Sequence, residues 1–275
     1  MPKNSKNAVN TRFTVEKVNA HMRRVMLTVA YDGTNYCGWQ LQPNVETIEG
    51  VLNKELSRLL DEDIKVIGAS RTDAGVHAEG AIAVFDTNAR IPGEKFSYAL
   101  NRSLPDDIVI RKSQDVPSDF HPRKTSTKKT YRYSLWLDDF PLPGERLYRH
   151  WVYTKLDIDK MKQAAKYFEG QHDFEGFCSA NNQTESTIRT IYELNVVQDV
   201  DKRKIDILVT GNGFLYNMVR IISGTLIEVG QGKIDVDDLE EIILSKDRSR
   251  AGNTAPAKGL TLVKYEFTDY ENIVP

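Results

Sequence analysis

The sequence predicts an α+β fold in which two ferredoxin-like βαββαβ subdomains join into one mixed, mainly antiparallel sheet with helices on one face. Three observations predict this fold. The first half of the chain alternates strand and helix patterns in the order β-α-β-β-α-β, and the second half repeats this order with a different sequence. The chain has 275 residues and is 40% hydrophobic, which is enough to bury a large core.

The first subdomain is expected over residues 23–116. Apolar and β-branched runs predict its four strands, at residues 24–31, 64–67, 81–85 and 108–111. A helix is expected from about 47 to 61, because its apolar residues fall on one face and Thr47 is a suitable N-cap. A second helix should run from Pro92, at its first position, to about residue 102.

The second subdomain is expected over residues 117–270. Its strands are predicted at residues 130–137, 188–197, 205–209 and 260–267. Its helices are predicted from residue 158 to a stop at Gly170, at residues 214–229 and at residues 235–244. Residues 1–22 are polar and show no useful periodicity, so we expect a disordered N-terminal extension there and no secretory signal.

Composition excludes several classes of protein. No apolar run approaches the roughly 18 residues that span a bilayer, so no membrane partner is expected. Cys37 and Cys178 are isolated, without the paired spacing of a zinc site, so we expect no metal and a cytoplasmic protein with reduced cysteines.

The segment Arg71-Thr72-Asp73-Ala74-Gly75-Val76-His77-Ala78 carries the most chemistry. It places a carboxylate, a guanidinium and an imidazole on a loop between two predicted strands, where catalytic side chains often lie. Gly75 can adopt a positive φ and so allows a sharp turn that presents Asp73. Local physics alone favours a simpler interpretation, in which Asp73 caps its own backbone and His77 is a surface residue.

Charge is unevenly distributed, although the net charge is only −2. Residues 120–137 contain no acid, and their basic residues are interleaved with Tyr131, Tyr133 and Trp136. A solvated charge run is the usual explanation. The aromatic residues favour instead a strand that faces RNA, because cations bind phosphates and rings stack on bases.

The loop Arg71–Ala78 resembles the active-site signature of the TruA family of tRNA pseudouridine synthases. Four other segments also look like family segments and occur in family order: Tyr31–Thr34 with Gly38–Gln40, Asp119–Arg123, Lys129–Tyr133 and Phe214–Arg220. The resemblance spans about residues 23–267. Two residues depart from the family pattern: Ser70 stands where Gly is usual, and Gly213 stands where Ala is common. Both are small, so these departures affect only the expected loop geometry.

The resemblance implies the pseudouridine synthase fold, with an RNA-binding cleft where the two halves meet. It implies an isomerase that converts uridine to pseudouridine at positions 38, 39 and 40 in the anticodon stem-loop of tRNA. The enzyme would be a homodimer and would need neither cofactor nor metal. The target base must be flipped out of its helix, because its glycosidic bond is out of reach inside a stacked stem.

Roles for individual residues also follow from the resemblance. Asp73 is expected to be the nucleophile, with Arg220 paired to it across the cleft so that the carboxylate stays ionised. An arginine in the otherwise apolar run 218–222 usually has a buried partner. Tyr131 is expected to stack under the base, with its phenol where the C5 proton must leave; spacing alone does not separate it from Tyr133.

Contacts to the RNA are expected from several further residues. Arg71 would fill the gap left by the flipped nucleotide or bind its phosphate. His77, in the same loop, is expected to contact substrate. Phosphate contacts are expected from Arg123, Lys128, Lys129 and Arg132.

Two other classes of function fit parts of the sequence. Paired βαββαβ units also build non-catalytic RNA-binding proteins of the RRM type, although residues 81–85 carry only one of the aromatic residues such a strand needs. A small-molecule enzyme could use Asp73 as a general base, but the basic aromatic strand would then have no role.

Overall fold

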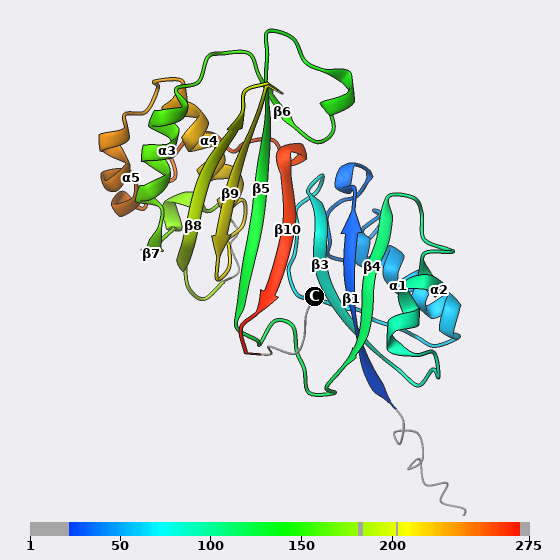
Figure 1. The fold of residues 1–275 in the computed structure, drawn as a ribbon. Helices are drawn as coiled ribbons and strands as arrows, with labels where there is room; N and C mark the ends of the chain where they lie inside the picture. Colours follow the sequence, from blue (N-terminus) through cyan, green and yellow to red (C-terminus); the bar gives the residue numbers. More distant parts are fainter. Residues whose placement is uncertain (1–21, 181–183, 202, 270–275) are drawn as a thin grey trace, which may run out of the picture.

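The computed structural model describes residues 22–180, 184–201 and 203–269, and in these it shows one continuous mixed sheet with flanking helices (Figure 1). The strands lie in the order β4-β1-β3-β10-β5-β9-β8-β7, with β2 paired to β3 and β6 paired to β5. The strands are β1 (Arg23–Tyr31), β2 (Ile67–Gly68), β3 (His77–Thr87), β4 (Ile108–Val116), β5 (Thr127–Leu137), β6 (His150–Val152), β7 (Gly170–Asp173), β8 (Ile188–Asp199), β9 (Lys204–Gly211) and β10 (Leu260–Phe267). The helices are α1 (Ile48–Leu60), α2 (Phe96–Leu100), α3 (Ile158–Tyr167), α4 (Met218–Gly230) and α5 (Leu239–Ser245).

The predicted fold class is confirmed. The first half runs β1-α1-β2-β3-α2-β4, and the second half repeats this order with β5, α3, β8, β9, α4 and β10. Most neighbouring strands are antiparallel, whereas the pairs β3–β10 and β5–β6 are parallel. The division into subdomains at residues 116 and 117 stays a prediction, and the expectation for residues 1–22 lies outside the described residues except for Met22.

The last strand, β10, lies between β3 of the first half and β5 of the second and so joins the two halves into one sheet (Figure 1). On one side it pairs with the start of β3, where Leu262 lies opposite Ala78. On its other side Leu262 lies opposite Tyr131 of β5. The loop that precedes β3 is therefore one strand away from Tyr131, although the two are far apart in the sequence.

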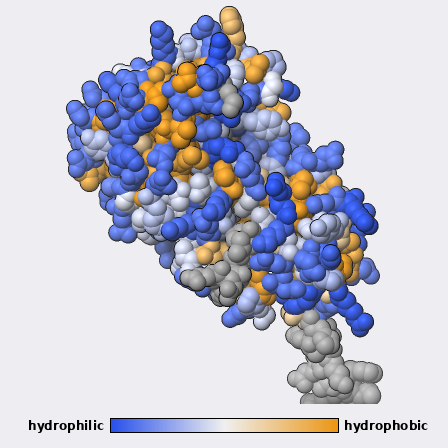
Figure 2. All heavy atoms as spheres, viewed as in Figure 1, coloured by the Kyte–Doolittle hydropathy of each residue, from blue (hydrophilic) through white to orange (hydrophobic). Residues whose placement is uncertain are grey.

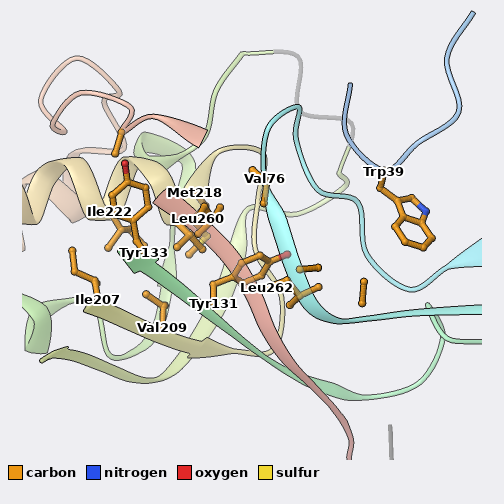
Figure 3. Packing of buried hydrophobic residues seen from close by; sticks show 14 of the residues in the cluster. Trp39, Val76, Tyr131, Tyr133, Ile207, Val209, Met218, Ile222, Leu260 and Leu262 are labelled. Atoms are coloured by element: carbon orange, nitrogen blue, oxygen red, sulfur yellow. The ribbon is translucent and has the colours of Figure 1, made fainter. Parts of the chain in front are cut away.

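The main core is a single cluster of buried apolar side chains to which all the α-helices of the described chain contribute. Alternation along the strands creates it: Val25, Leu27 and Val29 of β1 face this cluster, while Met26 faces a smaller one on the opposite side. Figure 3 shows part of the main cluster where β5 and β10 meet α4. Hydrophilic residues cover most of the molecular face in Figure 2, with apolar residues gathered mainly over its upper part.

Two predicted elements of the first half are shorter than expected. The strand predicted at residues 64–67 is reduced to Ile67–Gly68. The backbone amides of residues 64 and 66 bind to side chains of α1 and not to a neighbouring strand. Ser57 Oγ accepts from the Ile64 amide at 2.9 Å, and Asn53 Oδ1 accepts from the Val66 amide at 2.8 Å. The helix predicted at residues 92–102 begins with a 3₁₀ turn and is α-helical only over Phe96–Leu100.

The second half differs from the prediction at its helices and at two short strands. The helix expected to stop at Gly170 ends at Tyr167, and the helix predicted at residues 235–244 begins with a 3₁₀ turn and is α-helical only over Leu239–Ser245. The helix predicted from residue 214 begins only at Met218, because Asn217 adopts the left-handed conformation with φ of 61°. Strands β6 and β7 were not predicted, since three or four residues are too few to show a period.

A close backbone approach makes Gly38 sensitive to substitution. Its φ is +85°, and a Cβ built on it would lie 2.5 Å from the carbonyl oxygen of Thr72, next to Asp73. Gly38→Ala is therefore expected to lower the free energy of unfolding by about 2 kcal/mol and Tm by roughly 5 °C. Thermal unfolding followed by circular dichroism measures this. Gly144→Ala is the matched control, because nothing lies within 4 Å of its added Cβ, and an equal loss in both variants would contradict the argument.

Candidate active site

A cavity of about 930 Å³ lies where the two halves of the sheet meet. The loop before β3 forms one wall of this cavity, and the segment that leads into α4 forms the other. Side chains of β5 lie between them. Residues that line the cavity include Ser70–Ala74, Arg123, Lys129, Tyr131 and Phe214–Val219.

The turn that presents Asp73 is fixed by its neighbours in the first half. Gly75 adopts a φ of +76°, as the sequence predicted, and the Val76 amide donates to the carbonyl oxygen of Asp73 at 3.1 Å. The Thr72 hydroxyl lies 2.8 Å from that of buried Tyr31, and its carbonyl accepts from the Trp39 amide at 3.1 Å. The first strand and the turn after it therefore hold the loop on both sides of Asp73.

Arg220 of α4, in the second half, pairs with Asp73 of the first half, as the resemblance implied, although Arg220 is not itself among the residues that line the cavity. Its Nη1 lies 3.5 Å from Asp73 Oδ2, and the two side chains are 17% and 26% exposed. Two shorter hydrogen bonds fix the guanidinium: Nη1 donates to Asn217 Oδ1 at 2.6 Å, and Nε donates to the carbonyl oxygen of Ala255 at 2.8 Å. The guanidinium is thus held chiefly by its own half of the protein and faces the carboxylate at a longer distance.

The protonation of Asp73 reflects two opposing effects. Burial raises the pKa of this carboxyl, whereas Arg220 lowers it by charge and by hydrogen bonding. Burial is the larger effect, so the pKa lies above its ordinary value of 3.8. The expectation that Arg220 favours the ionised form is right for its own contribution, but the sequence did not reveal the burial that exceeds it.

Tyr131 lines the cavity and Tyr133 does not, which separates two residues that spacing could not. Tyr131 is only 7% exposed, and its ring contacts Phe214 edge-on with 5.3 Å between centroids. Tyr133 is fully buried beside α4, and its hydroxyl donates to the carbonyl oxygen of Pro256 at 2.9 Å (Figure 3). Burial raises the pKa of the Tyr131 phenol, so that the hydroxyl is neutral.

His77 is placed away from the cavity. It is 5% exposed, its Nδ1 accepts from the Gly33 amide at 3.1 Å, and its Nε2 lies 3.0 Å from the carbonyl oxygen of Leu147. Its ring also contacts Tyr148, whose hydroxyl donates to Asp32 at 2.7 Å. Through these contacts His77 connects the end of the loop that carries Asp73 with the segment around Leu147 in the second half.

The predicted RNA-binding cations fall into two groups. Arg71, which is exposed, lines the cavity together with Arg123 and Lys129. Lys128 and Arg132 do not line it. Lys128 lies over the ring of Tyr192 at 5.2 Å, and Arg132 pairs with Glu79 at 2.6 Å.

Asn217 is a site residue that the sequence reasoning missed. It accepts from Arg220, and its own amide donates to the Ser179 hydroxyl at 2.9 Å. Because it precedes α4 in the left-handed conformation, its side chain lies beside the first turn of the helix. An Asn before an apolar run is a recognisable signal for such a position, but its partner Arg220 could not be read from spacing.

The described residues contain no group of three or more His, Cys, Asp and Glu side chains arranged to hold a metal ion. Across the same ranges, no helix combines the length and the apolar character that crossing a bilayer requires.

One mixed sheet that places a partly buried carboxylate beside a guanidinium, with an aromatic ring lining the same cavity as the carboxylate, fits the pseudouridine synthases as a class. The family model described as tRNA pseudouridine synthase matches residues 27–123 and 164–268. The chain belongs to this family.

Relatives from several bacteria match along nearly their whole length. The tRNA pseudouridine synthase A of Ruminiclostridium cellulolyticum is 50% identical over 90% of this chain and 100% of its own. The protein of the same name from Acetivibrio thermocellus is also 50% identical, over the same shares of the two chains. Among solved structures, the archaeal box H/ACA sRNP Nop10–Cbf5 complex matches with a TM-score of 0.36 and 12% identity, covering 84% of this chain and 60% of that one, which is too distant to support a conclusion.

The family establishes that the protein is an enzyme, an isomerase that converts uridine to pseudouridine. The interpretation as a non-catalytic RNA-binding module is therefore not favoured.

Proposed function

We propose that this protein converts uridine to pseudouridine at positions 38, 39 and 40 in the anticodon stem-loop of tRNA, with Asp73 as the nucleophile. The observation that carries the assignment of the site is that Asp73 and Tyr131 line one cavity and that Arg220 pairs with Asp73. Membership of the tRNA pseudouridine synthase family supports the substrate class.

The reaction is an internal rearrangement, so its atoms balance without a co-reactant. The bond between C1′ and N1 breaks, the detached uracil turns, and C5 bonds to C1′. The C5 proton then leaves and N1 gains a proton. Asp73 supplies the carboxylate that starts the reaction, and Arg220 orients it.

Tyr131 and Arg71 would handle the base and the gap that it leaves. The Tyr131 ring provides an apolar platform at the cavity wall, held edge-on by Phe214. Arg71 is exposed at the rim of the same cavity, where it can enter the stem or bind phosphate once the base is extruded. His77 would act by positioning the loop that carries both Arg71 and Asp73.

Salt dependence tests the predicted phosphate contacts. Replacing Arg123 and Lys128 together by Ala is expected to weaken tRNA binding. The slope of the logarithm of the binding constant against the logarithm of the salt concentration should also become smaller by about 1 to 2, because each phosphate contact that is lost leaves fewer counterions to be released on binding. Filter binding between low and high salt measures the slope. Lys162→Ala, which removes an exposed lysine from α3, is expected to leave the slope unchanged. Equal slopes in all three proteins would refute the contacts.

We also propose that the enzyme works in the cytoplasm as a homodimer in which one tRNA touches both subunits. The segment that follows β5 exposes large apolar side chains, among them Phe140 at 78% and Tyr153 at 68%. Sedimentation equilibrium at micromolar concentration tests the assembly, and a mass of one chain under those conditions would refute it.

Site-specific labelling tests the positions. A tRNA with tritium at C5 of its uridines is expected to release label to water when uridine stands at positions 38, 39 or 40. The matched control carries cytidine at these positions and should release none. Release that continues from the control tRNA would overturn the positional assignment and leave the isomerase activity itself intact.

A further inference from the structure

A second cavity of about 410 Å³ adjoins the catalytic one. The two cavities share Ala69, Arg123 and Lys129 in their linings. The walls of the second cavity are mostly polar, with the hydroxyl side chains of residues 125–127 beside the ring of Tyr265. Arg123 and Lys129 therefore lie where the cavities meet.

Lys129 is a partly buried cation that has no carboxylate partner in the part of the chain that the structure describes. It precedes Tyr131 by two residues on β5 and so shares its face, and its Nζ lies 5.2 Å from the centre of the Tyr265 ring. Burial and the positive charge of Arg189 lower the pKa of Lys129 to about 8. A cation in such a place is costly unless a negative group comes to it.

Arg123 adds a second positive charge, and its guanidinium is held in place by a hydrogen bond. Its Nε donates to the carbonyl oxygen of Gly68 at 2.7 Å, which holds the base of the guanidinium against the first half. Among the described residues, neither Arg123 nor Lys129 forms an ion pair with an acid. The carboxylate of Asp269 near the second cavity accepts from the Ser126 amide at 3.0 Å.

We propose that Arg123 and Lys129 bind the phosphodiester that joins the target uridine to one neighbouring nucleotide, and that the second cavity receives this neighbour. The proposal rests on the proposed function, because it takes the uridine to occupy the first cavity. Adjacent nucleotides in RNA are joined through a single phosphate, so two adjoining cavities that share two cations match a dinucleotide. The ring of Tyr192, which is 48% exposed, offers a stacking surface to the second base.

Neutral phosphate linkages test this arrangement. Anticodon-arm RNAs are made with a methylphosphonate on the 5′ side or on the 3′ side of the target uridine. For the wild-type enzyme, one of the two is expected to raise KM about tenfold, since a charge-assisted contact is lost. Lys129→Gln should raise KM about tenfold for the unmodified RNA, and the same neutral linkage should then raise its KM by a smaller factor than in the wild type, because only Arg123 still contacts the phosphate.

Matched variants separate this contact from general charge effects. Lys264→Gln removes a lysine from the neighbouring strand β10, where it pairs with Glu266, and should respond to the linkage as the wild type does. Lys129→Arg keeps the charge and should retain most of the response. Circular dichroism verifies the folding of each variant, and Arg123→Gln, which removes the other shared cation, replaces Lys129→Gln in the cycle if the latter is unfolded.

The outcomes separate this proposal from the proposed function. If the linkage and Lys129→Gln act independently, so that their effects multiply, or if neither linkage affects the wild type, the phosphodiester site is refuted. If the wild type releases no tritium from unmodified RNA, the proposed function fails. Filter binding of the same RNAs needs no turnover. It then still decides whether the effect of the neutral linkage on affinity depends on Lys129.

Discussion

Asp73→Asn is expected to abolish the release of tritium from C5 of uridine while leaving tRNA binding within about twofold. The amide has nearly the same volume as the carboxylate and can still accept from Arg220, so the cavity keeps its shape. It cannot act as a nucleophile, and losing such a group lowers kcat by about 10⁴-fold or more. Release of label in single-turnover reactions, together with filter binding, measures the two quantities separately.

The control for this substitution is Asp63→Asn. Asp63 is exposed, pairs loosely with Lys65 at 3.6 Å and does not line the cavity, so its loss should not alter either quantity. Wild-type rates in Asp73→Asn would remove this carboxylate from the mechanism. A loss of binding equal to the loss of rate would assign it to substrate recognition instead.

The order of the elements could be predicted because each long element carries its own periodicity. Strand β1 and helix α1 were expected within one residue of their observed limits, and the Thr47 side chain caps α1 by accepting from the Gly50 amide as predicted. The insertion of β10 between the halves is a matter of tertiary pairing, which no local pattern encodes. The cleft depends on that insertion, since β10 brings the loop of Asp73 beside Tyr131.

The candidate site was reached by family resemblance more than by local physics. Spacing could not choose between Tyr131 and Tyr133, because that choice depends on what packs against the strand. In the structure the alternation along β5 directs Lys129 and Tyr131 toward the cavity and leaves Lys128 outside it. Their roles in catalysis and binding stay predictions.

The balance of charge at Asp73 also could not be read from the sequence. A neighbouring guanidinium lowers the pKa of an acid, and this is the only effect that a motif suggests. Burial acts in the opposite direction and depends on the loops around Tyr31 and Trp39, which close over Thr72. The site therefore holds a carboxylate that is harder to ionise than usual, beside a cation that partly offsets this cost.

Arg220→Gln is expected to move the acid limb of the pH–rate profile to higher pH and to lower kcat about 100-fold at neutral pH. Asp73 acts in its ionised form, so activity is lost as pH falls through its pKa. Arg220 lowers that pKa and burial raises it; removing the guanidinium leaves burial unopposed, and the pKa rises further. The loss of activity on acidification must then begin at a higher pH than in the wild type.

Single-turnover rates measured from the lowest pH at which the enzyme stays folded up to neutral pH record the limb directly. Arg220→Lys provides the comparison, because it keeps the positive charge but cannot reproduce the paired bonds to Asn217 and Ala255. It should lower kcat with a smaller displacement of the limb. A fall in kcat for Arg220→Gln with the limb in its wild-type place would show that Arg220 orients the substrate or the fold, and that the ionisation of Asp73 does not depend on it.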